Sequence, residues 1–252
     1  MKPIILNGEI NSVGHIQTKE SISSLRKLIE ADKVVIIKDA FDKSLLNSIK
    51  NEVFDFGQET EEKNMKTNAN TGNFHRIDDN HPTMSVKRVA HFFRYSYSER
   101  KSTSIFEIIH PLNILRNQIA ELDTNYSFFD DESGYVSQPA ALHYPCGGGY
   151  MQAHSDPIEP QKVEMVCSLS ERGKDFISGG LAIYQDKEWH DVEKYIAFGD
   201  ICLFKPDSPH KVEPIDPEES KSFDSIKGRW TVFSPIAHIY DNTKNEASVA
   251  SS

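Results

Sequence analysis

The chain has 252 residues, and its 38 acidic and 28 basic residues give a formal net charge of -10. A surface of that charge repels nucleic-acid phosphates in most orientations, so we expect no nucleic-acid partner. No stretch approaches the ~20 apolar residues of a membrane span, and the three cysteines form no paired spacing, which predicts a cytoplasmic protein without membrane segments or disulfides.

The first part of the chain predicts two helices with a short strand between them. Thr18 and Asp42 are candidate N-caps, because each precedes a stretch in which Leu, Ile and Val recur at helical spacing, over 22–29 and 45–53. Residues 34–37 are a run of Val and Ile that indicates a buried strand. Helices with a single apolar face usually cover a sheet, and we expect both to do so.

The next segment is polar. Residues 57–73 show no hydrophobic period and predict a long loop, which in a compact domain is either disordered or a functional lid. Residues 73–82 allow two interpretations. One is a solvated turn in which Arg76 occurs by chance. The other is that Arg76 enters the site and binds a substrate carboxylate through two parallel hydrogen bonds.

Further along, residues 91–95 favour a strand, and 104–122 predict a long amphipathic helix that braces the outside of a sheet. From Tyr135 onward the sequence changes to short β-type runs bounded by Gly, Pro, Asp or Asn. The predicted strands are 140–144, 163–169, 181–184, 201–204, 212–215 and 230–239. This punctuation is typical of antiparallel sandwiches, so the pattern predicts a mainly β fold with flanking helices, arranged as a double-sheet jelly roll.

Two histidines and an aspartate form a candidate metal site. In an extended strand alternate side chains share a face, so His154 and Asp156 point to one interior spot, with Gln152 and Tyr150 on the same side. His210 follows an apolar run and supplies a third ligand. Two imidazoles and one carboxylate on one face of a metal leave the opposite positions open, as in non-haem Fe(II) oxygenases.

The order His154-x-Asp156, then a distal His210, then Arg229-x-Thr231 resembles the Fe(II)- and 2-oxoglutarate-dependent oxygenases. The resemblance covers residues 142–238 and includes the glycine run at 147–149. It implies a cupin-like double-stranded β-helix with the metal between two four-stranded sheets. It also implies Fe(II) as the metal, 2-oxoglutarate as cosubstrate and dioxygen as co-reactant.

The same resemblance implies roles for further residues. Arg229 and the hydroxyl of Thr231, two apart on a strand, would bind the far carboxylate of 2-oxoglutarate. Tyr144 either hydrogen-bonds the cosubstrate or is a core aromatic residue. Gln152 lies on the His154 face by parity and is expected to line the substrate or cosubstrate pocket. The other histidines considered as ligands lack the Gly-Asp-strand approach of His210, and are His143, His190 and His238.

The implied reaction is hydroxylation of an unactivated C–H bond, coupled to decarboxylation of 2-oxoglutarate to succinate. Asp156 stands where halogenating members have Gly or Ala, which favours hydroxylation over chlorination. The glycine run and the small size are similar to bacterial members that act on free amino acids, including lysine hydroxylases and halogenases. Arg76 would then neutralise the α-carboxylate. The alternatives are a prolyl-type peptide hydroxylase with an open groove and a non-catalytic jelly-roll binding protein.

We expect residues 1–252 to form a single oxygenase domain. In this division residues 1–134 provide supporting helices and strands and a lid, 135–240 form the double-stranded β-helix, and 241–252 are a disordered tail. The expected partner is a small, amino-acid-like molecule. The sequence gives no prediction of the oligomeric state.

Overall fold

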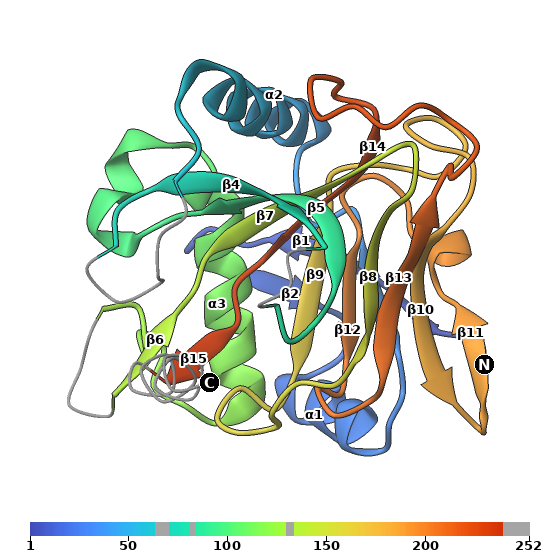
Figure 1. Cartoon of the computed structure of the whole chain (residues 1–252). Coiled ribbons are helices and arrows are strands. Elements are labelled where there is room, and N and C mark those ends of the chain that lie inside the picture. Colours follow the sequence, from blue (N-terminus) through green and yellow to red (C-terminus); the bar gives the residue numbers. More distant parts are fainter. Residues whose placement is uncertain (64–70, 81–83, 130–133, 239–252) are drawn as a thin grey trace, which may run out of the picture.

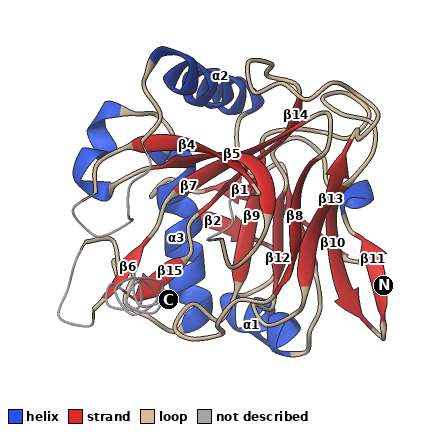
Figure 2. Ribbon diagram, viewed as in Figure 1, coloured by secondary structure: helices blue, strands red, loops and turns tan. Residues whose placement is uncertain are grey.

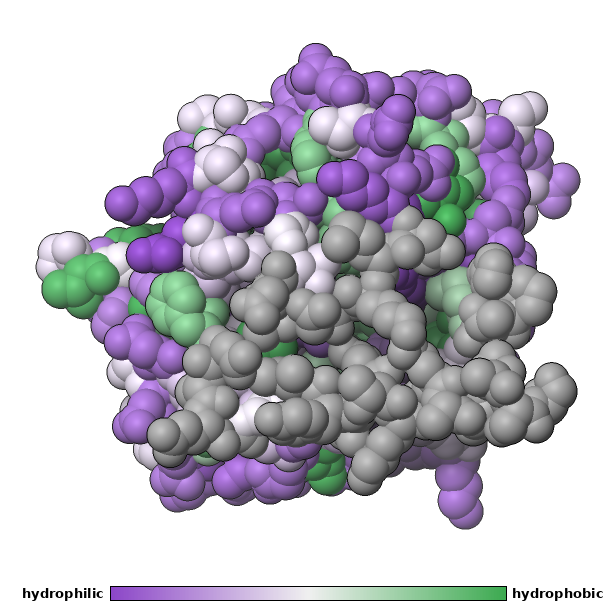
Figure 3. Space-filling model, turned by 60° about the vertical axis from the view of Figure 1, so that its left-hand side comes forward, coloured by the Kyte–Doolittle hydropathy of each residue, from purple (hydrophilic) through white to green (hydrophobic). Residues whose placement is uncertain are grey.

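The computed structural model describes residues 1–63, 71–80, 84–129 and 134–238. Within these ranges the protein is mainly β, with helices at the periphery (Figure 2). No helix in the described part of the chain is long and apolar enough to cross a membrane. On the face shown in Figure 3 the coloured residues are mostly hydrophilic, and hydrophobic residues show in small areas.

The elements follow one another in this order. The strands are β1 (Ile4–Ile10), β2 (Ile16–Thr18), β3 (Val35–Lys38), β4 (Phe74–Asp79), β5 (Arg88–Arg94), β6 (Tyr135–Ser137), β7 (Ala140–Pro145), β8 (Gly149–His154), β9 (Glu164–Ser168), β10 (Gly180–Gln185), β11 (Glu188–Asp191), β12 (Ile201–Phe204), β13 (His210–Ile215), β14 (Gly228–Phe233) and β15 (Ile236–His238). The α-helices are α1 (Ile22–Glu30), α2 (Lys43–Glu59) and α3 (Phe106–Ala120), and two short 3-10 helices span Tyr97–Ser102 and Glu193–Tyr195.

The sheet doubles back on itself at β5. Thirteen of the described strands form one ladder in the order β11-β10-β13-β8-β5-β7-β14-β9-β12-β3-β1-β2, with β4 beside β5. The start of β5 pairs with β8, whereas its later residues pair with β7, so this strand joins two facing layers (Figure 1). This confirms the double-stranded β-helix. The two layers have more strands than the four each that were expected: β5 connects them, and β3, β1 and β2 extend one of them.

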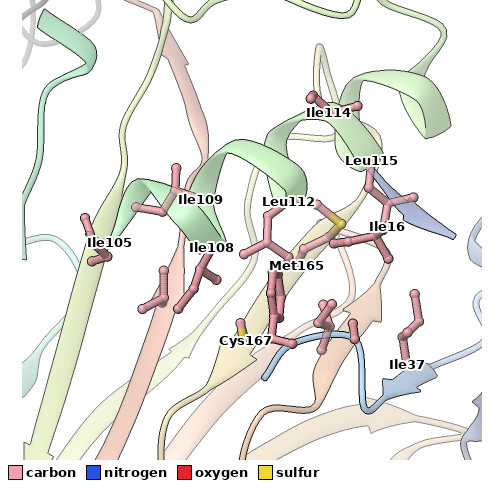
Figure 4. Packing of buried hydrophobic residues seen from close by; sticks show 14 of the residues in the cluster. Ile16, Ile37, Ile105, Ile108, Ile109, Leu112, Ile114, Leu115, Met165 and Cys167 are labelled. Carbon is pink, nitrogen blue, oxygen red and sulfur yellow. The ribbon is translucent and has the colours of Figure 1, made fainter. Parts of the chain in front are cut away.

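The three helices cover the outer face of the layer that contains β14, β9, β12 and β3. Leu112 of α3 lies over Met165 and Cys167 of β9 (Figure 4), within a core cluster that also includes Leu25 of α1 and Leu46 of α2. Alternate residues of the same strands face the interior of the roll. There Ile36, Cys202 and Phe204 form a second cluster with Leu181 and Ile183 of the opposite layer. Burial on both faces explains why these strands read as continuous apolar runs.

The helix boundaries confirm one predicted cap and correct another. Asp42 caps α2, where its carboxylate accepts from the backbone N–H groups of Ser44 and Leu45. The cap of α1 is Ser21 and not Thr18, which belongs to β2. Thr18 instead accepts from the N–H of Glu20, which closes a local turn before the helix begins.

The predicted loop at 57–73 begins too early, since α2 continues through Gly57 to Glu59. A Cβ on Gly57 would lie 2.7 Å from Cε1 of Phe93 and 2.8 Å from Cε1 of His91, so the glycine permits close packing of helix on strand rather than ending the helix. Residues 64–70 lie outside the described ranges, and the lid therefore stays a prediction.

Two further segments differ from expectation. The turn expected at 73–82 is strand β4 over most of its described length, and among the described strands β4 pairs with β5 alone. Its polar sequence fits an edge strand with one exposed side. The single strand expected at 230–239 is two strands, β14 and β15. Pro235 between them cannot donate to a ladder, and β15 pairs with β6 in a small separate sheet.

Three buried histidines lie beneath α2, outside the predicted metal site. Nδ1 of His75 and Nε2 of His91 are 2.8 Å apart, and His143 stacks on Trp230 with ring centroids 4.2 Å apart. Burial lowers the pKa of His91 to about 3, with a further contribution from the charges of His75 and His143. Burial likewise lowers the pKa of His143 to about 4. Both imidazoles are therefore neutral in the folded protein at pH 7.

These two histidines should make the fold sensitive to acid. In the unfolded chain each histidine has a pKa of about 6.5, so it binds a proton that the native state excludes. The free energy of unfolding therefore falls as the pH drops from about 6.5 towards 4. We expect a loss of about 1 kcal/mol per histidine for the first pH unit. Urea unfolding at a series of pH values measures it, and His143→Gln should reduce the slope. An unchanged slope in that variant would contradict the assignment.

Candidate metal centre

Three side chains converge at one end of the interior. His154 ends β8 and His210 begins β13, and the two residues are paired across these strands. Asp156 lies two residues beyond the end of β8, where its N–H donates to the carbonyl of Pro206. Its Oδ2 is 3.4 Å from Nε2 of His210 and 3.8 Å from Nε2 of His154. The ligand atoms of all three lie within 4.8 Å of one another.

Both imidazoles are held in the orientation that a metal requires. Nδ1 of His154 is 2.9 Å from the carbonyl oxygen of Gln152, and Nδ1 of His210 is 3.0 Å from that of Ser208. A carbonyl only accepts, so each Nδ1 carries a proton, and in the neutral imidazole the lone pair is then on Nε2, beside Asp156. Such second bonds fix the tautomer of metal-binding histidines.

Burial favours the neutral, metal-binding form of His210. Desolvation lowers its pKa, and the neighbouring His154 charge acts in the same direction. The bond to the Ser208 carbonyl and the Asp156 carboxylate act in the opposite direction. The Asp156 side chain is 37% exposed against 10% for His210. The group is therefore accessible from one side and closed on the other.

A bulge in β8 corrects the parity argument. His210 pairs with His154 and Val212 with Met151, so two steps along β13 match three along β8. One extra residue shifts the alternation, and Met151 therefore faces the interior with His154. Gln152 is exposed, and its Oε1 accepts from the N–H of Lys87. The prediction that Gln152 lines the pocket is wrong for this reason.

A cavity of about 240 Å³ extends from the three side chains between the two layers. It is lined by His154, Asp156 and His210, and also by Arg229, Thr231 and Tyr144. Most of the remaining lining is apolar, including Leu142, Val166, Leu181 and Phe204. The volume lies just below the range of roughly 300–1,000 Å³ typical of drug-sized ligands, so it suits small molecules. Six of the eight residues selected from the sequence thus share one cavity.

Arg229 forms a buried ion pair that the sequence did not indicate. Its Nε donates to Oε2 of Glu193 at 2.8 Å, and the two side chains are 2% and 1% exposed. The same oxygen accepts from the N–H of Leu181, which fixes the carboxylate. Within the described residues the guanidinium bonds through Nε alone, so its Nη groups remain for a ligand in the cavity that Arg229 lines.

Tyr144 and Thr231 lie beside this guanidinium. Arg229 and Tyr144 are directly paired across β14 and β7, and the guanidinium carbon is 5.7 Å from the centre of the tyrosine ring. Burial raises the pKa of Tyr144 to about 12, so the phenol keeps its proton, and its hydroxyl is 3.9 Å from Sδ of Met151. Thr231 is two residues from Arg229 on the same face. The three side chains form a polar end of the cavity.

Arg76 does not reach the cavity lining, whereas Arg88 does. Arg76 donates from Nε to Oδ1 of Asp78 at 2.9 Å and lies over the ring of Phe92 at 4.7 Å. Arg88 bonds the other oxygen of Asp78 through Nε at 2.7 Å and lines the cavity. The alternation of side chains along one strand does not show which of these two arginines lines the cavity, because they lie on two neighbouring strands, β4 and β5. The sequence analysis selected Arg76, which lies outside the cavity lining.

A second carboxyl group, that of Glu164, also lines the cavity. It starts β9 and accepts from Nε2 of Gln161 at 2.7 Å. Burial raises its pKa to about 8, and the negative charge of Asp156 adds to the effect. Glu164 was missed, although parity with Val166 in the strand predicted at 163–169 was the available signal.

The donor set fits Fe(II). Two imidazole nitrogens and one carboxylate oxygen on the same side match the arrangement of non-haem iron oxygenases, and the cavity adjoins the side left open. The neighbouring Arg229 suits a carboxylate, because guanidinium binds it in a planar, bidentate manner. The three ligand side chains therefore suit a metal ion, and Arg229 suits the carboxylate of an organic acid.

No protein-family model matches the sequence. No curated protein matches it either. Solved structures match in fold. A Pseudomonas putida prolyl-4-hydroxylase is 14% identical with a TM-score of 0.55, over 85% of this chain and 97% of that one. A Trichoplax adhaerens prolyl hydroxylase, in complex with a hypoxia inducible factor peptide fragment, is 16% identical with a TM-score of 0.57, over 92% of each chain.

A third structure, a Neurospora crassa protein in complex with alpha-KG and thymine, is 11% identical with a TM-score of 0.53, over 84% of this chain and 79% of that one. At these identities the likeness establishes the architecture alone. The chain has the double-stranded β-helix fold found in 2-oxoglutarate-dependent Fe(II) oxygenases.

Proposed function

We propose that this protein is an Fe(II)- and 2-oxoglutarate-dependent dioxygenase that hydroxylates a C–H bond of a small, amino-acid-like molecule. One observation carries the proposal: two imidazole Nε2 atoms and one carboxylate oxygen face a common point at the edge of a cavity, with both Nδ1 atoms bonded to carbonyls. The shared fold supports it. Asp156 as third ligand favours hydroxylation over halogenation.

His154, Asp156 and His210 would hold the iron, and the open side would receive 2-oxoglutarate and dioxygen. When bound, these groups supply the oxidation: dioxygen delivers one atom to the substrate and one to succinate, with release of carbon dioxide. Arg229 and Thr231 would bind the distal carboxylate of the cosubstrate. Tyr144, protonated at neutral pH, can donate a hydrogen bond to the same molecule.

The chain itself positions the reactants and excludes water. The apolar lining contributed by Leu142, Val166 and Phe204 leaves few partners for water near the triad. In such surroundings the ion pair between guanidinium and carboxylate is stronger than in solution. Fixed anchoring at Arg229 and at the triad holds the cosubstrate in one orientation, which lowers the entropy cost of the reaction.

The size and charge of the cavity favour a small polar substrate. At about 240 Å³ it has room for 2-oxoglutarate and part of a compact second molecule. Arg88, fixed by Asp78, replaces Arg76 in our proposal as the group that meets a substrate carboxylate. A free amino acid is the class that combines small size with such a carboxylate.

A peptide substrate is the second candidate, because the P. putida and T. adhaerens structures are of prolyl hydroxylases. A prolyl-type enzyme needs an open groove that leads to the iron. The cavity of this chain lies between the layers and is lined by side chains of both, and its volume of about 240 Å³ suits a small molecule better than a peptide segment. A non-catalytic binding protein would not need the hydrogen bonds from Nδ1 of His154 and His210 that hold both imidazoles in a metal-binding orientation.

Succinate formation tests the proposal. The purified protein, loaded with Fe(II) under argon, is mixed with 2-oxoglutarate and air in the presence of single free amino acids or proline-containing peptides. We expect iron-dependent succinate that increases with one or a few amino acids. Stimulation by peptides alone would show that the substrate is a peptide and not a free amino acid. Failure to bind Fe(II) in an anaerobic titration would overturn the enzyme assignment.

A further inference from the structure

The cavity contains a carboxyl group that the proposed reaction does not use. Of the described residues that line it, two are acidic, Asp156 and Glu164, and the first belongs to the metal centre. Glu164 is 7% exposed, and its hydrogen bond within the described part of the chain comes from the Gln161 amide. We propose that Glu164 binds a primary ammonium group of the substrate. This inference rests on the proposed function.

Glu164 lies on the substrate side of the metal centre. The cavity-lining residues of β14 run from Arg229 through Thr231 to Phe233, and Phe233 is paired with Val166 of the antiparallel β9. Glu164 is two residues further along β9, away from Arg229. Residues 229 and 233 alone are separated by about 13 Å of strand. A cosubstrate anchored at Arg229 and at the iron therefore leaves the Glu164 end unoccupied.

The position is also close to the iron ligands. Glu164 is paired with Phe204 across β9 and β12, and the Phe204 ring lies 5.0 Å from the ring of His210. A substrate group held by Glu164 thus places neighbouring carbon atoms beside the metal centre. A substrate anchor in this position determines which C–H bond of the substrate lies nearest to the metal centre.

The surroundings explain why the missing partner is a cation. Around Glu164 the lining is apolar, with Val166, Phe204 and Phe233. The charge of the buried Arg116 guanidinium lowers the Glu164 pKa in part, but its hydrogen bonds within the described residues go to Asn113, Asn117, Ser127 and the Ser234 carbonyl and not to Glu164. An ionised carboxylate is costly in these surroundings, so burial, with a further contribution from the charge of Asp156, raises the Glu164 pKa to about 8, and the group is mostly protonated at pH 7. A bound ammonium group favours the ionised form and offsets both effects.

The Gln161 amide prepares Glu164 for such a ligand. Oε1 of Gln161 accepts from the N–H of Ile236 at 2.9 Å, which leaves its amide group to donate to Oε2 of Glu164. One carboxylate oxygen is thereby fixed, and the other is available to the cavity. A fixed acceptor loses little freedom when an ammonium donor arrives. Once an ammonium ligand ionises it, Glu164 provides with Arg88, which also lines the cavity, the two charges that recognise a zwitterion.

Binding measurements on the resting complex test the proposal. The wild type and Glu164→Gln are loaded with Mn(II) and 2-oxoglutarate under argon, and ligands are titrated by calorimetry. Leucine is compared with its 2-hydroxy analogue, which reports an α-ammonium group, and lysine with norleucine, which reports a side-chain ammonium. In the wild type one ammonium compound should bind at least about tenfold more tightly than the partner that lacks that ammonium group, as for a charge-assisted bond. Glu164→Gln should remove that preference.

Several measurements separate the possible outcomes. Mn(II) and 2-oxoglutarate affinities are determined first, and their absence in the wild type would defeat the proposed function rather than the role of Glu164. Glu218→Gln, which removes an exposed carboxylate outside the cavity, should keep the preference. Glu164→Asp, which withdraws the carboxylate by one methylene, should reduce it and serves if the glutamine variant does not fold. No preference for any ammonium compound in the wild type, or an unchanged preference in both Glu164 variants, would overturn the proposal.

Discussion

Replacing His210 by alanine should abolish iron-dependent succinate formation and remove measurable Fe(II) binding. The variant loses one of the two imidazole ligands, and a methyl group offers no lone pair in its place. Loss of the hydrogen bonds behind a metal ligand already costs roughly 10–100-fold in affinity or activity, so loss of the ligand itself should cost more. His154→Ala should have the same effect, because the two histidines hold equivalent positions on paired strands.

The matched control is His190→Ala, in strand β11. It makes the same chemical change at a histidine whose imidazole bonds the N-terminal amine and the Gln185 carbonyl, outside the metal centre. Anaerobic Fe(II) titration and thermal unfolding are measured for each variant. Ordinary turnover in purified His210→Ala, or equal loss of iron in His190→Ala, would show that the iron site has been placed wrongly.

The fold was largely predictable because short strands bounded by Gly, Pro and Asp leave a strong pattern. The strand over 34–37 and the Asp42 cap follow from local rules and are observed. The edge strand β4 was missed, since Arg76 and Asp78 give it a polar face that looks like a turn. Gly57 was placed at the start of the predicted loop, but it belongs to α2 and permits the close packing of that helix on His91 and Phe93.

The site was predictable in its ligands and less so in its surroundings. Spacing brings His154 and Asp156 together whether or not the strand continues between them, so that part of the argument survives the end of β8 at His154. Gln152 depended on strict alternation, which the bulge breaks. Glu193 is 36 residues from its partner Arg229, so its place depends on how the two layers pack, and no local pattern contains that information. Glu164, in contrast, could have been found from its parity with Val166.

The pair formed by Arg229 and Glu193 has consequences for binding and for folding. Together they place a buried cation beside a buried anion, so the end of the cavity has no net charge before a ligand binds. Oε1 of Glu193 is buried and has no hydrogen-bond partner in the described part of the chain. Removal of Arg229 alone would therefore leave an unpaired buried carboxylate, and any loss of activity would combine a lost ligand contact with a weakened fold.

Two variants separate these effects. Arg229→Gln should raise the 2-oxoglutarate concentration needed for half-maximal turnover on the order of 100-fold, because it removes charged hydrogen bonds to the distal carboxylate. It should also cost about 3–5 kcal/mol of stability, the usual effect of breaking a buried ion pair. The double variant Arg229→Gln/Glu193→Gln lacks the same cation but leaves no charge unpaired, so stability should return while the 2-oxoglutarate requirement stays high. Urea unfolding and succinate kinetics measure the two quantities. If the double variant regains the wild-type requirement, Arg229 supports the fold and does not bind the cosubstrate.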